Sequence, residues 1–338
     1  MSTADATEAE FNPHYGESDP KTLPCLYEQS SHFRNWRFSP QKLHEIRSDL
    51  HLKAIEKFNS TMELEKLARK KKNSSRADSA TMPLFSEEIA DEYLTMEEEN
   101  LLYQFYENNI TLLAKKLDWP VMVKFTAIVY MKRFYLYNTL MDFQISNILL
   151  TCLYLACKVE NAFIPIDKFV THIPRLEAST ILDLEFRVSQ SLKFDFAVIH
   201  PYRPLYGIML DLQRLPFHVS LITEAYQDAI PYLDFSYRTD ATFTCLPSQL
   251  ALAAFRLSAT KKGLDFDSYL KVTFGDNHSA ITSILDSIQR DIFPGEGPSP
   301  YRSDKDRIKR LDRKLIFARE PERNPKNALY ISKNSSTN

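Results

Sequence analysis

The segment from Ile145 to Asn161, ISNILLTCLYLACKVEN, carries the most continuous apolar pattern that we find in the chain. Up to Val159 its apolar residues lie around nearly the whole helical circumference, whereas a surface helix shows a single apolar stripe. A helix that is hydrophobic on all sides belongs inside a bundle, and this run is shorter than the roughly 20 residues that span a bilayer. We therefore predict a buried central helix that carries charge only where it ends.

Amphipathic helices are predicted near both ends of the chain. The first, residues 39–60, begins with Ser39-Pro40, residue types that are favoured at a helix N-cap and first turn. Its apolar positions form one stripe: Leu43, Ile46, Leu50, Ala54 and Phe58. The second, residues 300–320, places Ile308, Leu311 and Leu315 among many charges. Because each helix has one apolar face, we expect both to pack on the body of the protein or on each other.

The sequence around the central helix predicts a compact five-helix unit. Thr95 and Glu98 form a capping-box pattern that opens its first helix, and the central helix is its third. The basic stretch 67–80 is interpreted as a solvated loop rather than as a localisation or binding patch. The expected order is a disordered tail (1–30), an N-terminal helix (39–60), a linker with the basic loop (61–94), the first unit (95–196), a second unit (197–293), a C-terminal helix (300–320) and a disordered tail (321–338).

The second half of the chain repeats the first. Residues 247–263 can be laid on the central helix at an offset of 102 residues. Further on, PIDKFV aligns with DFDSYL, and TILD aligns with SILD. Because three matches follow the same order at a nearly constant offset, we predict two copies of one unit. The expected fold class is all-α, with two tandem five-helix repeats flanked by N- and C-terminal amphipathic helices.

Composition narrows the class of protein further. The chain has only six glycines, fewer than a hairpin-rich or phosphate-cradling protein normally needs. Its net charge of −2 argues against a general nucleic-acid binder. Its four cysteines have no CxxC spacing, so we interpret them as reduced residues of an intracellular protein. We recognise no secretory signal and no membrane span, and we expect a soluble protein of the cytosol or nucleus.

We find no catalytic constellation in the sequence. No phosphate-binding loop, zinc-protease motif or nucleophile elbow occurs, and the eight histidines are scattered along the chain. No set of Cys and His has the spacing of metal ligands. We therefore expect a binding protein that is not an enzyme and that needs neither a metal nor a cofactor.

Several motifs resemble the cyclin family. They are LACKVEN at the end of the central helix, the preceding KRFYL, and the run ILDLEFRVSQSLKFDF. HFRNWRFS, YMKRFYLYN, HPYRPLYG and LPSQLALAA point more narrowly to the cyclin of the CDK-activating kinase. The resemblance covers about residues 31–320, with the motifs in order. It implies two tandem cyclin boxes flanked by terminal helices, which agrees with the pattern described above.

The resemblance implies a kinase contact at the end of the central helix. In cyclins, a Lys in this place and a Glu on the fifth helix contact the kinase and hold its αC helix in the active position. The matching residues are Lys158, with its neighbours Val159 and Glu160, and Glu185. Our repeat alignment sets Thr260 and Ile288 opposite Lys158 and Glu185, so the second unit lacks the charged pair. The alternative is that Lys158 and Glu185 are ordinary solvated helix residues, since a Lys is favourable at a helix C-terminus without any partner.

The resemblance also implies partners, and two features of the sequence differ from the pattern of many cell-cycle cyclins. It implies a cyclin-dependent kinase, a RING-finger assembly subunit and the core of the transcription factor TFIIH as partners, in the nucleus. No direct contact with nucleic acid or membrane is expected. The segment 95–106 lacks the Arg of the substrate-docking patch of many cell-cycle cyclins, and Lys132 stands where those often have Asp. Another transcriptional cyclin, a nucleic-acid-binding cyclin-fold factor like the core of TFIIB, and a plain helical scaffold remain the alternatives.

Overall fold

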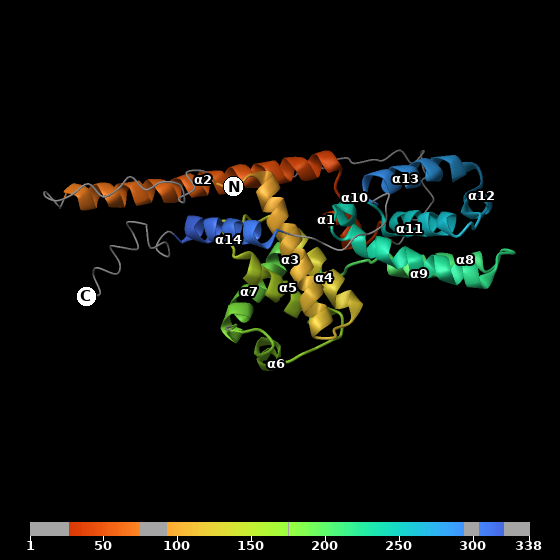
Figure 1. Cartoon of the computed structure of the whole chain (residues 1–338), viewed down its shortest axis with the longest axis horizontal. Coiled ribbons are helices and arrows are strands. Elements are labelled where there is room, and N and C mark those ends of the chain that lie inside the picture. Colours follow the sequence, from red (N-terminus) through yellow and green to blue (C-terminus); the bar gives the residue numbers. More distant parts are fainter. Residues whose placement is uncertain (1–26, 75–92, 175, 294–303, 321–338) are drawn as a thin grey trace, which may run out of the picture. The chain divides into compact units, whose positions relative to one another are not determined.

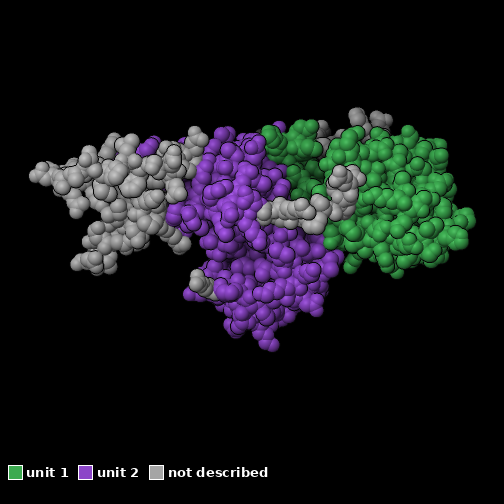
Figure 2. Space-filling view, viewed as in Figure 1, with its two compact units in different colours: residues 1–44, 197–298 green, residues 45–196, 299–338 purple. Residues whose placement is uncertain are grey.

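The computed structural model describes residues 27–74, 93–174, 176–293 and 304–320, and these ranges contain helices and turns but no strand (Figure 1). The chain divides into two compact units (Figure 2). Unit 1 comprises residues 1–44 and 197–298, and unit 2 comprises residues 45–196 and 299–338. The all-α prediction is thereby confirmed. Within the described ranges, every helix is too short or too polar to cross a membrane.

The predicted central helix forms the core of unit 2. It is α5 (Ile145–Val159), and every residue from 148 to 157 is buried. The helix contacts three neighbours: α3 (Met96–Lys116), α4 (Val121–Phe134) and α7 (Ala178–Ser191). A short helix, α6 (Ile166–Thr171), precedes α7. Helices on several sides bury the circumference of α5, which is why the sequence of α5 has no polar face.

The capping box predicted at the start of α3 is present. The amide of Glu98 donates to the hydroxyl of Thr95 at 3.2 Å, and the amide of Thr95 donates to the carboxylate of Glu98 at 3.1 Å. These two bonds satisfy amides that the first turn of a helix leaves without partners. The first helix of the unit therefore begins where the sequence pattern places it.

Both terminal amphipathic helices pack on unit 2. Helix α14 (Lys305–Arg319) contacts α3, and the three residues of its predicted stripe are buried. Lys314 donates to the backbone carbonyl of Tyr93 at 3.2 Å. From α2 (Pro40–Ser74), the Nδ1 atom of His51 lies 3.0 Å from a carboxylate oxygen of Glu99 in α3. The expectation that these helices pack on the body therefore holds within unit 2.

Helix α2 is longer than we predicted. It extends to Ser74, whereas the sequence pattern placed its end at residue 60 and a loop from residue 67. The last residue of its predicted apolar stripe, Phe58, is buried. Residues 61–72 contain neither Gly nor Pro and are mostly Leu, Met, Glu, Lys, Arg and Ala, which have high helix propensity. The helix therefore continues on backbone propensity beyond its predicted apolar stripe, while the rest of the predicted linker, 75–92, lies outside the described residues.

Unit 1 contains the second copy of the repeat. Its helices are α8 (Tyr202–Leu212), α9 (Val219–Ser236), α10 (Ala241–Thr244), α11 (Pro247–Lys261), α12 (Phe266–Phe274) and α13 (His278–Asp291), with a 3-10 turn at Gly275–Asn277. Helix α11 matches the bounds of α5 at the predicted offset of 102 residues. Residues 250–255 are buried, and α11 contacts α8, α9 and α13. The short helix α10 is an addition that the repeat alignment did not predict.

A further helix that the sequence did not indicate, α1 (Ser31–Trp36), packs in unit 1. The backbone amide of Ile199 donates to Nδ1 of His32 at 3.1 Å, and Trp36 is fully buried. The amide of Phe38 donates to the carbonyl of Phe243 at 3.0 Å. Of the tail predicted to be disordered, residues 27–30 form a turn, and residues 1–26 lie outside the described residues. The other predicted tail, residues 321–338, also lies outside them.

Candidate functional site

The structure brings together the two charged residues that the sequence singled out. Nζ of Lys158, in the last turn of α5, lies 2.5 Å from Oε1 of Glu185 in α7. The lysine ammonium also lies 4.5 Å from the centre of the Tyr154 ring. The side chains are 32% and 22% exposed, so both groups keep contact with solvent and can be covered by a partner. The pair is therefore neither a core ion pair nor a fully solvated one.

The end of α5 determines where Lys158 is presented. Glu160 is the C-cap, and Asn161 follows with a φ of 58° in the left-handed region. The amide of Ala162 donates to the carbonyl of Cys157 at 2.9 Å, as in a Schellman motif. Asn is one of the few residues that tolerate this conformation, so the sequence Glu160-Asn161 ends the helix directly after Val159.

The other two predicted contact residues occupy different environments. Val159 is partly buried at the last position of α5. Glu160 turns toward α4, where it accepts a hydrogen bond of 2.5 Å from the buried hydroxyl of Thr126. The carboxylate of Glu160 therefore helps to anchor the end of α5 on α4, while Lys158 faces α7.

An exposed apolar patch lies beside Glu185 on α7, and the site prediction did not include it. Leu182 and Phe186 precede and follow Glu185 on α7, and Phe194 lies beyond the end of that helix. Phe186 and Phe194 are 68% and 55% exposed, with ring centroids 6.1 Å apart in an edge-to-face arrangement. We call Leu182, Phe186 and Phe194 the α7 patch. The sequence does contain a signal for this patch, because its apolar residues do not share the helix face of Ile181 and Val188, which are buried positions of α7.

The backbone after α7 holds Phe194 outward. Lys193 and Phe194 both have positive φ, 55° and 56°, a conformation that is unfavourable for residues with a Cβ. Two residues of α4 fix the following segment: Tyr130 donates to the carbonyl of Phe196 at 2.5 Å, and Arg133 donates to the carbonyl of Asp195 at 3.2 Å. Backbone strain that is held in place by buried donors and ends in an exposed aromatic ring is typical of a binding surface.

Unit 1 lacks this pair, but our repeat alignment needs a correction by one residue. Ile288, which it placed opposite Glu185, is buried, whereas Glu185 is partly exposed. Aligning the fully buried Leu285 with Ile181 instead places Gln289 opposite Glu185. Thr260, opposite Lys158, is exposed and its hydroxyl donates to the carbonyl of Arg256 in its own helix. The charged pair is absent from the second copy in either register.

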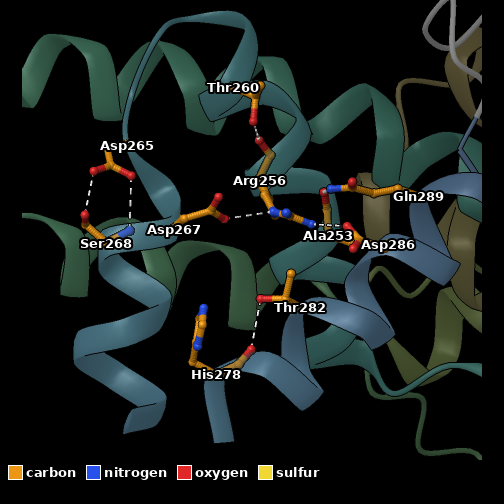
Figure 3. Close-up of polar contacts among 10 residues, drawn as sticks. All are labelled: Ala253, Arg256, Thr260, Asp265, Asp267, Ser268, His278, Thr282, Asp286 and Gln289. Carbon is orange, nitrogen blue, oxygen red and sulfur yellow. Dashed lines mark hydrogen bonds and ion pairs between the residues drawn. The ribbon is translucent and has the colours of Figure 1, made fainter. Parts of the chain in front are cut away.

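Unit 1 uses a different ion-pair arrangement between the equivalent helices. Arg256, one turn before Thr260, lies 3.2 Å from a carboxylate oxygen of Asp267 and 2.5 Å from one of Asp286 (Figure 3). Gln289 donates to the carbonyl of Ala253 at 3.1 Å. These contacts join α11 to α12 and α13 within the unit. Packing inside unit 1 therefore explains these polar residues, and no partner protein is needed to explain them.

The described part of the chain shows no group of three or more His, Cys, Asp or Glu side chains that is arranged to hold a metal ion. Three cysteines, Cys152, Cys157 and Cys245, are buried and free. Burial raises the pKa of the Cys157 thiol to about 12, so this sulfur is a poor nucleophile at neutral pH. The arrangement around Lys158 and Glu185 supports binding rather than covalent chemistry.

Comparison with known families agrees with the two copies of the repeat. Residues 91–197 match the family described as "Cyclin, N-terminal domain", and residues 200–292 match "Cyclin C-terminal domain". The two matches adjoin one another and include all helices from α3 to α13, with the Lys158–Glu185 pair inside the first.

Individual relatives point to one branch. Cyclin mcs2 of Schizosaccharomyces pombe is 29% identical, over 91% of this chain and 89% of that protein. Cyclin-H1-1 of Arabidopsis thaliana is 30% identical, over 86% of this chain and 87% of that protein. Cyclin-H of Xenopus laevis is 31% identical over 57% of this chain and 63% of its own length. The narrower resemblance found in the sequence, to cyclin H, is confirmed.

Comparison with solved structures agrees with these relatives. A chain of the CAK complex of Chaetomium thermophilum bound to ATP-γ-S has a TM-score of 0.71 and 28% identity, covering 92% of this chain and 93% of that one. A chain of the yeast TFIIK (Kin28/Ccl1/Tfb3) complex has a TM-score of 0.61 and 26% identity, covering 79% and 100%. The likeness to a relative that is 30% identical and matched over most of its length establishes the family: this chain belongs to the cyclins.

Proposed function

We propose that this chain is the regulatory cyclin subunit of a CDK-activating kinase, the kinase module of TFIIH, and that it activates the catalytic subunit without chemistry of its own. The observation that carries the proposal is the partly exposed Lys158–Glu185 pair beside the α7 patch, on a chain that resembles chains of CAK and TFIIK complexes. By this function the complex phosphorylates the activation loops of cyclin-dependent kinases and the C-terminal domain of RNA polymerase II.

The activating contact follows from the chemistry of the surface. A kinase helix that covers Lys158 and Glu185 offers backbone and side-chain partners to both charges, and it buries Phe186 and Phe194. Burying a Phe side chain contributes about 1.5–3 kcal/mol. If only the inward position of the αC helix meets this surface, binding shifts the kinase toward the state in which its Lys–Glu ion pair forms. Val159, next to Lys158, extends the same contact, and Glu160 holds the end of α5 in place.

Other partners follow from the same assignment. The yeast TFIIK complex contains a third chain, Tfb3, besides Kin28 and Ccl1. By analogy this chain binds a RING-finger assembly subunit, which connects the kinase module to the TFIIH core. Such a role places the protein in the nucleus, and it requires no metal or cofactor in this chain and no direct contact with nucleic acid.

A charge swap tests the role of the central pair. In Lys158→Glu with Glu185→Lys, the two side chains can still form an ion pair within unit 2, so folding stability is largely kept. Each charge that faces the kinase is reversed, and the cost of disrupting a buried interfacial charge is roughly 2–5 kcal/mol. We expect affinity for the cognate kinase subunit to fall at least about 30-fold, with a matching loss of activation.

The matched control is the same swap on an exposed pair of α14, Asp306→Lys with Lys309→Asp, whose side chains are 3.5 Å apart. It should leave kinase binding unchanged. A swapped Lys158–Glu185 variant that melts normally and activates the kinase like the wild type would show that the pair only joins α5 to α7. Salt-dependent binding of DNA by the wild-type chain, without any binding of the kinase, would favour the TFIIB-like alternative.

A further inference from the structure

One turn before Lys158, helix α5 places an aromatic ring against the lysine ammonium. Nζ of Lys158 lies 4.5 Å from the centre of the Tyr154 ring, and Oε1 of Glu185 lies 2.5 Å from the same nitrogen. A cation within about 6 Å of the face of an aromatic ring is attracted by the ring quadrupole. The ammonium is therefore held by two groups, of which one is a carboxylate and the other is a ring without charge.

The Tyr154 ring is itself held in place by two further aromatic residues. It is only 4% exposed and packs edge-to-face on Phe169 of α6, with ring centroids 5.1 Å apart. Phe169 is fully buried and stacks on Trp119, between α3 and α4, with centroids 5.6 Å apart and ring planes inclined by 7°. Because each ring packs against the next, the orientation of Tyr154 is determined inside unit 2 before any partner binds.

The second copy of the repeat has no ring at the corresponding position. At the offset of 102 residues, Arg256 of α11 takes the place of Tyr154. There it forms ion pairs with two aspartates of α12 and α13 (Figure 3). Thr260 takes the place of Lys158. The packing of this helix in a repeat unit therefore does not require an aromatic side chain, and the ring is present only where the lysine is.

We infer that Tyr154 is a positioning residue for the kinase contact, because its ring holds the Lys158 ammonium in the place from which it binds the kinase. This inference rests on the proposed function, since it concerns the same contact. A lysine side chain has many rotamers and loses this freedom when it is fixed. Because Tyr154 restricts Lys158 in the free chain, part of that entropy is lost before the kinase binds and does not weaken the complex.

An aromatic ring suits this role better than a second acidic residue would. A lysine ammonium has three N–H donors, and Glu185 accepts a hydrogen bond from one of them. The ring attracts the positive charge without adding a negative one, so the remaining donors stay available for oxygen atoms of the kinase. The attraction is stronger at sites from which water is excluded. A kinase that covers Lys158 therefore strengthens its contact with Tyr154, and this gain adds to the affinity.

The simpler explanation is that Tyr154 only fills space in the core, and a double-mutant cycle separates the two roles. Isothermal titration calorimetry measures the affinity of the full chain for the cognate kinase subunit. The wild type is compared with Tyr154→Leu, Lys158→Met and the variant that carries both substitutions. We expect Tyr154→Leu to weaken binding at least about 3-fold when Lys158 is present, and less than about 1.5-fold in the Lys158→Met chain.

Conservative replacements of the ring keep the test independent of folding. Tyr154→Phe retains the face of the ring and should bind the kinase as the wild type does. Phenylalanines that carry increasing numbers of fluorine atoms have nearly the same shape but a weaker quadrupole. Placed at position 154, they should lower the affinity step by step. In NMR spectra of the free chain, the ε-protons of Lys158 should show an upfield ring-current shift that Tyr154→Phe keeps and Tyr154→Leu removes.

The matched control is Tyr232→Leu in unit 1. Tyr232 is also 4% exposed, and Nζ of Lys261 lies 5.2 Å from the centre of its ring. This substitution likewise removes a buried tyrosine beside a lysine, so it should lower the melting temperature much as Tyr154→Leu does while leaving the affinity for the kinase unchanged. A similar loss of affinity in Tyr232→Leu would attribute the effect to lost stability and overturn the inference.

The remaining outcomes separate this inference from the proposed function. An equal effect of Tyr154→Leu with and without Lys158 would overturn the inference, and so would fluorinated rings that bind the kinase equally well. If Lys158→Met binds the kinase like the wild type, Lys158 is not part of the contact, and the inference is wrong together with the role of the charged pair. A wild-type chain that does not bind the kinase at all would refute the proposed function itself.

Discussion

The phenolic hydroxyl of Tyr106 in α3 donates a hydrogen bond of 2.8 Å to Oδ2 of Asp312 in α14, joining residues 206 positions apart. Both groups are largely removed from water, and this burial raises the pKa of the Asp312 carboxyl above its ordinary value of 3.8. The contact fixes the C-terminal helix on the first helix of the repeat that carries Lys158 and Glu185. We therefore expect the stability of unit 2 to vary with pH through Asp312.

We expect the Asp312 carboxylate to destabilise unit 2 at neutral pH relative to a neutral group. Because the folded-state pKa is raised, the folded protein binds more protons than the unfolded chain between pH 3.8 and that raised value. The contribution of Asp312 to the free energy of unfolding therefore increases as pH falls through this window. In Asp312→Asn this dependence is absent, so the stability difference should move in favour of the wild type between pH 7 and about 4. Urea unfolding of both proteins at several pH values measures this difference in the free energy of unfolding. If the two free energies change with pH in parallel, the prediction is wrong.

The ion pair between Lys132 and Glu107 offers a test of stability away from the candidate surface. Nζ of Lys132 lies 3.3 Å from Oε1 of Glu107, and the two side chains are only 8% and 7% exposed. Lys132→Met removes this positive charge from beside a buried carboxylate, which costs about 3–5 kcal/mol. In the double variant Lys132→Met with Glu107→Leu, most of this loss should be recovered because neither charge remains. Chemical denaturation measures the free energy of unfolding of the single and the double variant. Equal stability of the two would show that the buried charge of Glu107 does not cause the loss of stability.

The α7 patch should contribute to binding and little to folding. Phe186→Gln keeps a good helix former, and Phe194→Asn keeps a residue that tolerates the left-handed backbone. Because both rings are exposed in the free chain, the free energy of unfolding should change by less than about 0.5 kcal/mol. Affinity for the kinase should fall about 10-fold or more for each ring, since each loses its burial in the interface.

Isothermal titration calorimetry with the cognate kinase measures the effect of the α7 patch. Val272→Gln is the control, because Val272 is an exposed apolar residue of α12 in the other unit. Unchanged affinity of the Phe186→Gln, Phe194→Asn double variant would remove the patch from the interface.

The end of α5 should respond to substitution at Asn161. With φ at 58°, Asn161→Gly relieves the steric cost of a Cβ but adds entropy to the unfolded chain, so stability should change little. Asn161→Val forces a β-branched side chain into the same conformation and should cost about 1–2 kcal/mol. Thermal unfolding compares the two variants. A Val variant as stable as the wild type would mean that the end of α5 relaxes into another conformation.

Hydrophobic periodicity predicted most of the helices because each of them buries a face. The continuous apolar run of α5 needed no tertiary information, since only a helix surrounded by others has that composition. The offset of 102 residues between α5 and α11 likewise follows from two units that bury the same positions. The extension of α2 to Ser74 was missed because the apolar stripe that marked this helix ends at Phe58, and helix propensity alone leaves no periodic signal.

The candidate site was likewise predicted only in part. Sequence motifs singled out Lys158 and Glu185, but the order of residues does not say whether their side chains meet or how far water reaches them. The α7 patch was missed although its residues lie away from the buried positions of α7, because the sequence does not show which apolar residues a neighbouring segment covers. Helix α1 was missed because it is too short to show a period.

By itself, the amino-acid sequence determined the all-α class, the two repeats, the buried helix α5 and the positions of the charged pair. The first three follow from local periodicity and from comparison of the chain with itself, and the charged pair follows from the resemblance to the cyclins. Only the tertiary structure decided that Lys158 pairs with Glu185, that Glu160 turns to Thr126, and that Phe186 and Phe194 stay exposed. Such facts depend on which helices pack together in three dimensions, because burial and ion pairing arise between segments that are distant in the chain.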